Sequence, residues 1–254
     1  MRLSPFARLD RVIAPAPAPG RAAFLFDRPF AHRGLHGGSV VENSRSAFQA
    51  AIHQGFGIEC DVQASRDGEA FVFHDYDLDR LTPMTGPLDG RDAAQLDSIR
   101  LHGDAGAMLR LPDMLGLVAE RTPLLIEVKA RDRQVVPLCL SVRRALEGYR
   151  GPVAVMSFNP EVSRWFADHA PRILRGLVVT EQDRPGLRGE VRRRLALWRS
   201  KPDFLAYDIR DLPSRFAAAQ RRGGLPVLTW TVRDAAQRET AAIHADQIIF
   251  ENPA

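Results

Sequence analysis

The sequence predicts an α/β protein, a closed (β/α)8 TIM barrel, and three observations support this fold class. Eight short apolar segments alternate with segments of helical periodicity, which is typical of parallel strands joined by crossover helices. The length of 254 residues is usual for one such barrel. Polar side chains gather where the predicted strands end, as they do in barrels of this class. A doubly wound open sheet is the alternative, weakened because no glycine-rich dinucleotide loop follows the first strand.

The predicted elements form one domain, residues 29–254, behind an N-terminal extension, residues 1–28, that alternating prolines make stiff. Strands are expected at 29–33, 57–64, 123–128, 153–157, 173–179, 204–208, 226–232 and 247–251. Helices are expected at 43–54 with Asn43 as cap, 112–120, 134–147, 187–198, 213–222, from Pro160 after the Asn159 cap, and from Asp234. The long polar run 76–110 is predicted to be a small insertion after the second barrel strand.

The composition is that of a soluble globular chain, with 45% hydrophobic and 26% charged residues, and argues against a disordered class. The formal net charge is +4, and only Lys129 and Lys201 are lysines among the 35 basic residues. This bias indicates a chain-wide use of arginine, so no nucleic-acid partner is expected. The arginine-rich helix around residues 192–194 is interpreted as a solvated outer helix in preference to a lipid contact, because the sequence shows no strong amphipathic stripe.

The two cysteines, Cys60 and Cys139, fall in a predicted strand and a predicted helix, without the spacing of metal ligands. Both are interpreted as reduced packing residues, which favours a cytoplasmic location. No segment has the apolar core of a signal peptide or the ~20 apolar residues of a membrane span. Stable membrane insertion is therefore not expected.

The central stretch of the sequence, GIECDVQASRDGEAFVFHD at 57–75, predicts a strand, a tight turn and a returning strand. Glu59 and Asp61 are two residues apart and therefore point to the same face of the first strand. With the turn centred on residues 66–67, Ala64 is expected opposite Glu69 and, further back, Glu59 opposite His74. The two carboxylates would then face an imidazole.

Apolar residues around these acids indicate a buried strand pair, although most acids on strands simply face water. Two carboxylates in a poorly solvated place repel each other unless a proton or a cation relieves the repulsion. A cluster with only oxygen ligands suits a hard divalent cation, Mg²⁺ or Ca²⁺. The pattern therefore favours a metal site at Glu59 and Asp61, with a solvated strand face as the plainer alternative.

The segment IEVK adds a third carboxylate, Glu127, and a cation, Lys129, which share a face because they are two residues apart. In a chain that otherwise uses arginine, a lysine here indicates a need for a compact ammonium, which suits a phosphate oxygen as a point charge. An ordinary surface Glu-Lys pair is the alternative.

Eight short motifs occur in order along the chain: AHRG at 31–34, VENSRSAF at 41–48, IECDV at 58–62, DGEAFVFHDYDLDRLT at 67–82, LPDML at 111–115, LLIEVKA at 124–130, MSFNP at 156–160 and LTWTV at 228–232. Together they resemble the glycerophosphodiester phosphodiesterase family, of the phospholipase C-like phosphodiesterase superfamily. The resemblance extends over nearly all of residues 29–253. One such motif would be a weak signal, whereas the ordered set is specific.

The resemblance implies a barrel enzyme that uses one divalent cation to split a small-molecule glycerophosphodiester into glycerol 3-phosphate and an alcohol. Matched motif by motif, it implies His32 and His74 as acid and base, Glu59, Asp61 and Glu127 as metal ligands, Arg33 and Lys129 as phosphate ligands, and Trp230 on the glycerol side of the pocket. The chemistry asks for these residue types, because hydrolysis of an anionic diester needs charge neutralisation and proton transfer near neutral pH.

Two other functions stay open. A lysophospholipase D-like activity on lyso-lipids would need an apolar groove, which the 76–110 insertion could build. A catalytically silent barrel that binds a phosphorylated ligand is disfavoured, because both histidines and all three acids are present. The choice between Mg²⁺ and Ca²⁺, the alcohol, the assignment of acid and base, and the oligomeric state stay open at this stage.

Some residues beside the motifs have simpler interpretations. His36, in the loop after AHRG, is interpreted as a loop cap in preference to a phosphate ligand. Glu42 and Asn43 border the predicted site, although capping alone explains Asn43. Many relatives end the last strand in a Thr-Asp-x-Pro pattern, whereas this chain has Phe-Glu-Asn-Pro at 250–253, so Glu251 is left out of the predicted site.

Overall fold

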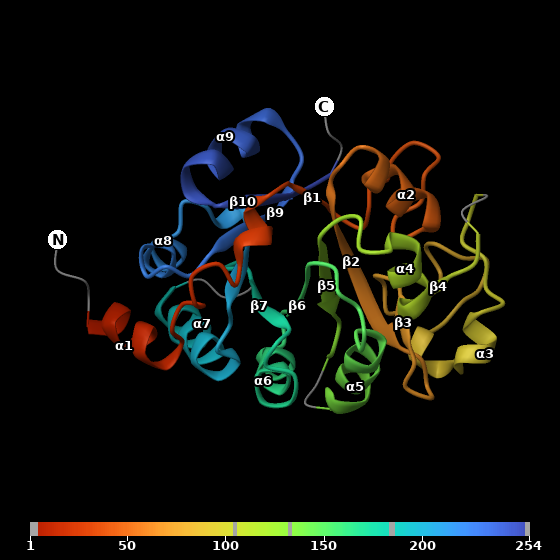
Figure 1. The fold of residues 1–254 in the computed structure, drawn as a ribbon, viewed down its shortest axis with the longest axis horizontal. Coiled ribbons are helices and arrows are strands. Elements are labelled where there is room, and N and C mark those ends of the chain that lie inside the picture. Colours follow the sequence, from red (N-terminus) through yellow and green to blue (C-terminus); the bar gives the residue numbers. More distant parts are fainter. Residues whose placement is uncertain (1–4, 104–105, 132–133, 183–185, 252–254) are drawn as a thin grey trace. The chain divides into compact units, whose positions relative to one another are not determined.

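The computed structural model describes residues 5–103, 106–131, 134–182 and 186–251 (Figure 1). The chain forms two compact units, one built from residues 30–153 and the other from the segment up to residue 29 together with residues 154–254. Both units alternate strands with helices along the chain. Asn252 and Pro253 of the last sequence motif lie outside the described residues.

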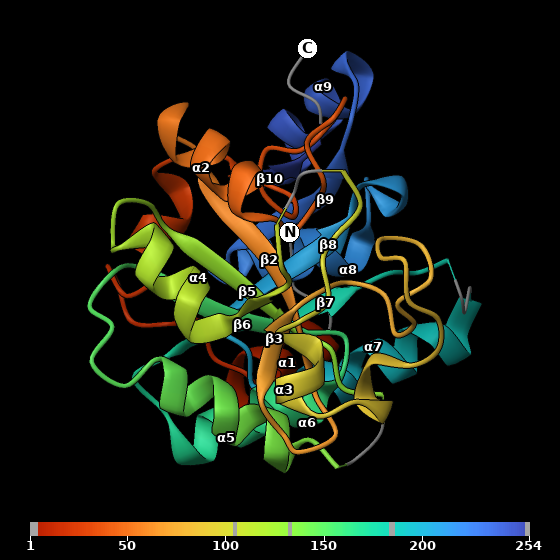
Figure 2. The ribbon, with the colours of Figure 1, turned by 90° about the vertical axis from the view of Figure 1, so that its right-hand side faces the viewer.

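Three parallel strands form the centre of the 30–153 unit: β1 (Phe30–Ala31), β2 (Gly57–Ala64) and β5 (Leu124–Val128). Ile58 of β2 lies opposite Ala31 on one side and opposite Leu124 on the other, so β2 is the central strand. The helices of this unit include α2 (Arg45–His53), α4 (Leu111–Val118) and α5 (Val136–Ala145). Helix α2 packs against α4, as Figure 2 shows.

β2 continues into an antiparallel hairpin with β3 (Ala70–Val72), and β3 pairs in turn with β4 (Leu109–Arg110). Between β3 and β4 the chain forms a short 3-10 helix, η2 (Leu88–Gly90), and one helical turn, α3 (Ala93–Leu96). The apolar side chains of this segment pack together in a buried cluster of Phe71, Phe73, Leu78, Leu81, Leu88, Ala93, Leu96, Ile99, Leu101 and Met108. The 76–110 segment therefore has a compact core of its own.

The predicted register of the hairpin is wrong by one residue. Ala64 pairs with Ala70 and not with Glu69. The connecting loop, 66–68, ends at Gly68, where a φ of +89° suits glycine and closes a three-residue turn. The turn is centred half a residue later in the sequence than predicted, so His74 is not opposite Glu59. It lies beyond the end of β3.

The other unit contains the remaining strands in the spatial order β6 (Val153–Ser157), β7 (Leu174–Val179), β8 (Phe204–Asp208), β9 (Val227–Val232) and β10 (Gln247–Phe250), all parallel. Between them run α6 (Pro160–His169), α7 (Gly186–Ser200), η3 (Ile209–Asp211), α8 (Arg215–Arg222) and α9 (Ala235–His244). Eight strands separated by helices confirm the predicted (β/α)8 class, and their bounds differ from the predicted ones by two residues at most.

The N-terminal segment folds onto this second unit. Helix α1 (Pro5–Ile13) packs against α7 and α8. Its buried Asp10 accepts hydrogen bonds from Trp198 Nε1 and Gln220 Nε2, both at 2.8 Å. A 3-10 helix, η1 (Ala23–Phe26), follows. The segment expected as an extension is thus attached by buried polar contacts as well as by packing.

One predicted helix cap agrees with the structure, and one does not. Asn159 accepts the Glu161 amide at 3.0 Å at the start of α6, and α9 starts at the expected place, with Asp234 as its cap. The cap of α2 is Ser44, whose Oγ accepts the Ala47 amide at 3.2 Å. The prediction of residue 43 as this cap is therefore wrong, since the helix begins one residue later than expected.

Candidate active site

Two neighbouring strands of the 30–153 unit bring three carboxylates together. Glu59 and Asp61 lie on β2, and Glu127 lies on β5 directly opposite Asp61 in the parallel register. All three side chains are buried, and one oxygen of each lies within 4.8 Å of the others. Strand alternation places the acids of β2 on one face, and the register between β2 and β5 joins all three into one cluster.

Two cations lie against the carboxylate cluster. The Lys129 ammonium is 3.2 Å from Asp61 Oδ1 and 3.2 Å from Glu127 Oε1. The Arg33 guanidinium Nε is 3.3 Å from Asp61 Oδ2, and the Arg33 backbone amide donates to Glu59 Oε2 at 2.9 Å. Arg33 has a φ of 55°, which is uncommon outside glycine. This backbone lets one residue contact two of the acids at once.

The two cations do not balance the three carboxylates of the cluster. Glu59 Oε1 is buried without a hydrogen-bond partner among the described residues. Burial, and next the charges of Asp61 and Glu127, raise the pKa of Glu59 well above its ordinary value. Burial also raises the pKa of Glu127 to about 7, although Lys129 opposes the shift. These are the features of a carboxylate set that binds a cation.

Asp61 differs from its two neighbours. Burial acts to raise its pKa, but Lys129 and Arg33 outweigh burial and hold the pKa of Asp61 at about 2. Burial likewise acts to lower the pKa of Lys129, and the charges of Asp61 and Glu127 raise it above its ordinary value. At neutral pH this pair is therefore ionised, whereas the raised pKa values of the two glutamates favour their protonated forms in the cation-free site.

The two histidines expected to be acid and base both belong to this unit. His32, directly after β1, is 8% exposed, and its Nε2 lies 3.8 Å from Glu59 Oε2. His74, after β3, is partly exposed, and its Nδ1 lies 2.6 Å from Asp75 Oδ1. Burial lowers the pKa of His74, and the charge of Asp61 opposes that shift. Each imidazole thus has one nitrogen beside a carboxylate.

Asp75 and Arg80, which the sequence analysis did not assign, connect the two sides of the site through Glu42. Arg80 Nε donates to Asp75 Oδ2 at 2.6 Å, and Arg80 Nη2 donates to Glu42 Oε1 at 2.7 Å. Glu42 Oε1 also accepts from Arg33 Nη1 at 2.8 Å. An ion-pair chain therefore joins His74 to Arg33. The only signal in the sequence is the polar run 74–80, because the partners come from separate loops.

The contact that Asn43 makes in the site is also not apparent from the sequence. It is buried, with a φ of 52°, and its Nδ2 donates to Asp61 Oδ2 at 3.0 Å. Its Oδ1 accepts the Asp61 amide at 3.4 Å. The asparagine therefore orients the central carboxylate. In the sequence an asparagine just before a helix looks like a cap, so this contact is visible only in the fold.

The other candidates have the following surroundings. Trp230, expected on the glycerol side of the pocket, lies on β9 in the second unit. Its Nε1 donates to the Ala206 carbonyl oxygen at 2.9 Å, and the Phe158 ring meets it edge-on at 5.4 Å between centroids. Glu251, at the end of β10, forms an ion pair with Arg233 Nε at 2.7 Å. These contacts are made within the second unit.

Comparison with known proteins identifies a family and several relatives of this chain. A family model for the glycerophosphoryl diester phosphodiesterase family matches residues 32–254. Putative glycerophosphodiester phosphodiesterase YhdW of Bacillus subtilis is 26% identical over 235 residues, 88% of this chain and 93% of that protein. A glycerophosphodiester phosphodiesterase of Bacillus altitudinis is 36% identical over 110 residues, 41% of this chain and 44% of that protein. The second match thus spans less than half of that relative.

Solved structures show a similar fold. An Oleispira antarctica phosphodiesterase, in complex with the product sn-glycerol-3-phosphate, matches with a TM-score of 0.77 at 22% identity, over 91% of this chain and 94% of that one. A glycerophosphodiester phosphodiesterase of Thermotoga maritima matches with a TM-score of 0.71 at 21% identity, over 88% of this chain and 94% of that one. At this level of identity the likeness establishes the fold alone.

Proposed function

The chain belongs to the glycerophosphoryl diester phosphodiesterase family, and from this premise we propose that it hydrolyses small glycerophosphodiesters to glycerol 3-phosphate and an alcohol with the help of a divalent cation. The observation that carries the proposal is the buried cluster of Glu59, Asp61 and Glu127 beside Arg33 and Lys129. Such a set of charges suits a site that receives a cation and a phosphate together.

Glu59, Asp61 and Glu127 would hold the cation. One oxygen of each lies within reach of a single ion, and Glu59 Oε1 has no other partner among the described residues. Three carboxylates are hard oxygen ligands and suit Mg²⁺ or Ca²⁺ alike. When bound, the cation would supply positive charge for the negative charge that develops on the phosphoryl oxygens.

Arg33 and Lys129 would bind the phosphate oxygens. Burial acts to lower the pKa of Arg33, but the charges of Asp61 and Glu42 raise it above its ordinary value. Both side chains therefore stay protonated in the site. Lys129 supplies a compact charge and Arg33 a fixed fork of donors, so together they neutralise oxygens of the phosphoryl group while it reacts.

His32 and His74 would transfer the protons. In the first step a glycerol hydroxyl of the substrate gives its proton to one histidine and attacks phosphorus, while the other histidine gives a proton to the departing alkoxide. A cyclic glycerol phosphate and the free alcohol result. Water then opens the ring with the two histidines in exchanged roles, which yields glycerol 3-phosphate and restores both protonation states.

We assign His74 as the acid that protonates the leaving alkoxide. The Asp75 carboxylate lies 2.6 Å from His74 Nδ1, which stabilises the protonated ring and leaves Nε2 to face the substrate. Burial acts to raise the pKa of Asp75, but its hydrogen bonds with Arg80 and His74 hold it at about 2. Asp75 is therefore an anion throughout the neutral range.

Small diesters are preferred over lyso-lipids as substrates because of how the insertion folds. Its apolar side chains pack in the insertion's own core. Among the described residues of 76–110, the large apolar side chains that stay exposed are Tyr76 and Met84. Two separate side chains are a poor wall for an acyl chain. The catalytically silent alternative is disfavoured by the complete set of acids and histidines.

A cytoplasmic location is part of the proposal. Cys60 lies on β2 and Cys139 on α5, and both are free and buried. Free buried thiols act as small apolar residues and suit a reducing compartment. Detection of the tagged protein in the cytoplasmic fraction of its host would support this location, and detection outside the cytoplasmic membrane would contradict it.

The proposed activity is tested by glycerol 3-phosphate release from glycerophosphocholine and glycerophosphoethanolamine. We expect EDTA to abolish release and added Mg²⁺ or Ca²⁺ to restore it, which also identifies the effective ion. His74→Ala should be nearly inactive, while His102→Ala, which removes an exposed histidine of the same unit, should match the wild type. Turnover that survives both EDTA and His74→Ala would overturn the proposal.

A further inference from the structure

Helices α1 and α7 of the second unit expose an unusual number of large apolar side chains. Three of them, on α7, recur every four residues and therefore share one face of the helix. The full set, with fractional exposure, is Phe6 (55%), Leu9 (41%), Val12 (78%), Leu187 (76%), Val191 (49%) and Leu195 (55%). Large exposed apolar patches usually mark an interaction site.

The two helices lie side by side (Figure 1), and their exposed side chains are here termed the α1/α7 face. The Arg194 guanidinium of α7 lies 4.7 Å from the centroid of the Phe6 ring, and Arg194 Nε lies 3.8 Å from the Asp10 carboxylate. Trp198 Nε1 donates to the same carboxylate. These contacts hold the helices together, and the apolar row of α7 stays exposed.

The α1/α7 face is positively charged. The two helices hold seven arginines and two acidic residues. Two of these arginines form ion pairs with glutamates outside the helices, so an excess of three positive charges is left. Arg188 and Arg192 are exposed beside the apolar row of α7, and neither forms an ion pair with a described residue.

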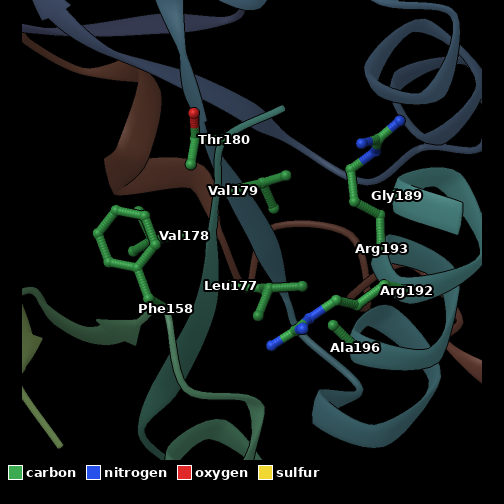
Figure 3. A pocket seen from close by; sticks show the side chains of 9 residues that line it. All are labelled: Phe158, Leu177, Val178, Val179, Thr180, Gly189, Arg192, Arg193 and Ala196. Atoms are coloured by element: carbon green, nitrogen blue, oxygen red, sulfur yellow. The ribbon is translucent and has the colours of Figure 1, made fainter. Parts of the chain in front are cut away.

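Arg192 also borders a pocket of about 520 Å³ between β7 and α7 (Figure 3). The pocket is lined by both apolar and polar side chains, among them Leu177, Phe158 and Thr180, and Figure 3 shows the Arg192 side chain extended toward Leu177. The neighbouring Arg193 already forms an ion pair with Glu181 at 3.0 Å. The Arg192 guanidinium can therefore bind an anionic group, and the same ligand would also contact the apolar side chains of the pocket.

We propose that the α1/α7 face docks the protein on an anionic lipid bilayer, with its apolar side chains in the headgroup region and its arginines on lipid phosphates. An apolar row flanked by arginines is typical of helices that lie in the plane of the interface. The attachment is peripheral, since no helix in the described part of the chain has the length and apolar character to cross a membrane. The proposal departs from the solvated outer helix expected from the sequence because the exposed side chains at 187, 191 and 195 share one face of α7.

Two other occupants fit this face less well. A second copy of the chain would bring two strongly positive faces together, and their repulsion opposes association. A nucleic acid would match the charge but would leave the exposed aliphatic side chains without an apolar partner. An anionic bilayer satisfies both the charge and the apolar row.

The test is sedimentation of the full chain with vesicles of phosphatidylcholine alone, or of equal parts phosphatidylcholine and phosphatidylglycerol. We expect binding to the anionic vesicles only, weakened by salt. Arg188→Gln/Arg192→Gln should weaken this binding about 25-fold, because each basic residue near an anionic surface contributes about fivefold. Val191→Ser/Leu195→Ser should weaken it about tenfold through lost apolar burial.

Matched variants control for charge, apolarity and folding. Arg100→Gln/Arg150→Gln removes two exposed arginines of the other unit, and Ile243→Ser removes a side chain that is 67% exposed on α9. Both should bind like the wild type. All four variants should hydrolyse dissolved glycerophosphocholine at the wild-type rate, so failure of docking is distinguished from failure of the proposed activity.

Four results would overturn the docking proposal. The first is no sedimentation with either kind of vesicle, and the second is equal sedimentation with both kinds. The third is that the α1/α7-face variants bind like the wild type. The fourth is tighter binding to duplex DNA than to anionic vesicles together with a neutral effect of Val191→Ser/Leu195→Ser, which would assign the face to nucleic acid.

Discussion

Two buried acids, one in each unit of the chain, have opposite electrostatic surroundings. In the second unit, Asp203 lies 3.2 Å from Arg175 Nη1 and 3.3 Å from Arg21 Nη2, so its charge is balanced by dedicated partners. In the 30–153 unit, Glu59 lies beside two further carboxylates, and one of its oxygens has no hydrogen-bond partner among the described residues. Both acids are buried, but only one of them is satisfied.

The two acids differ in whether their charge is balanced by partners within the fold. Removal of one partner from a buried pair of an acid and an arginine destabilises the fold, because it leaves an uncompensated buried charge. A buried acid held among like charges costs stability, and such sites are retained where binding or catalysis needs them. The contrast therefore predicts that substitutions at the site in the 30–153 unit change catalysis, and that substitution of the balanced acid in the second unit changes stability.

The largest expected effect is on catalysis in the 30–153 unit. His32→Ala should lower kcat for glycerophosphocholine by about 10²- to 10⁴-fold, because a proton-transfer group is lost from the site. Its melting temperature should stay close to that of the wild type. Steady-state kinetics and thermal unfolding measure the two quantities, and a kcat within a few-fold of the wild type would remove His32 from the mechanism.

The next effect is on stability in the second unit. Asp203→Asn should lower the free energy of unfolding by about 2 kcal/mol, because Arg175 and the partly exposed Arg21 lose their counter-charge. The kcat of the folded protein should not change. Urea unfolding measures the loss, with Glu147→Gln, which breaks an exposed i,i+4 pair, as a control expected to shift stability by less than about 0.5 kcal/mol. Equal losses in the two variants would contradict this account.

A smaller effect is expected for Arg80→Gln, which interrupts the ion-pair chain between Glu42 and Asp75. Asp75 would no longer be fixed beside His74, so kcat should fall about tenfold, as for other residues that orient a site. The alkaline limb of the pH–rate profile should shift as well, because the stabilisation of protonated His74 changes. A fall in stability with an unchanged pH profile would show a merely structural role.

The smallest effect concerns pH and the cation-free protein. Burial raises the pKa of Glu127 from its ordinary 4.5 to about 7. Within this window the folded chain binds more protons than the unfolded chain, so the free energy of unfolding falls as pH rises, by about 1 kcal/mol for each pH unit. Urea unfolding in EDTA should show this slope, and Glu127→Gln should flatten it. Stability that rises across the same window would contradict the raised pKa.

Much of the fold follows from the sequence, because the alternation of apolar strands and helices is regular along the whole chain. The acids were predictable for the same reason, since a two-residue spacing on a strand fixes a shared face. The hairpin register was not, because one loop residue decides it, and Gly68 permits the longer turn. The structure therefore moves His74 from a strand position to the loop that follows.

Contacts between separate loops could not be predicted from spacing. Glu42 and Arg80 are 38 residues apart and meet only after the chain has folded. Asn43 stands two residues before helix α2, where capping is the role that the sequence suggests, yet its side chain donates to Asp61. Both contacts depend on the tertiary structure and are not visible in the local sequence.

Calorimetric titration of Mg²⁺ and Ca²⁺ into the EDTA-treated, dialysed protein tests the central claim most directly. The account predicts that a single ion binds near neutral pH with release of protons, because the pKa values of Glu59 and Glu127 are raised in the free protein. Binding should be lost in Glu59→Gln/Glu127→Gln. Undiminished binding in that variant, or no binding by a wild type that remains fully active in EDTA, would contradict it.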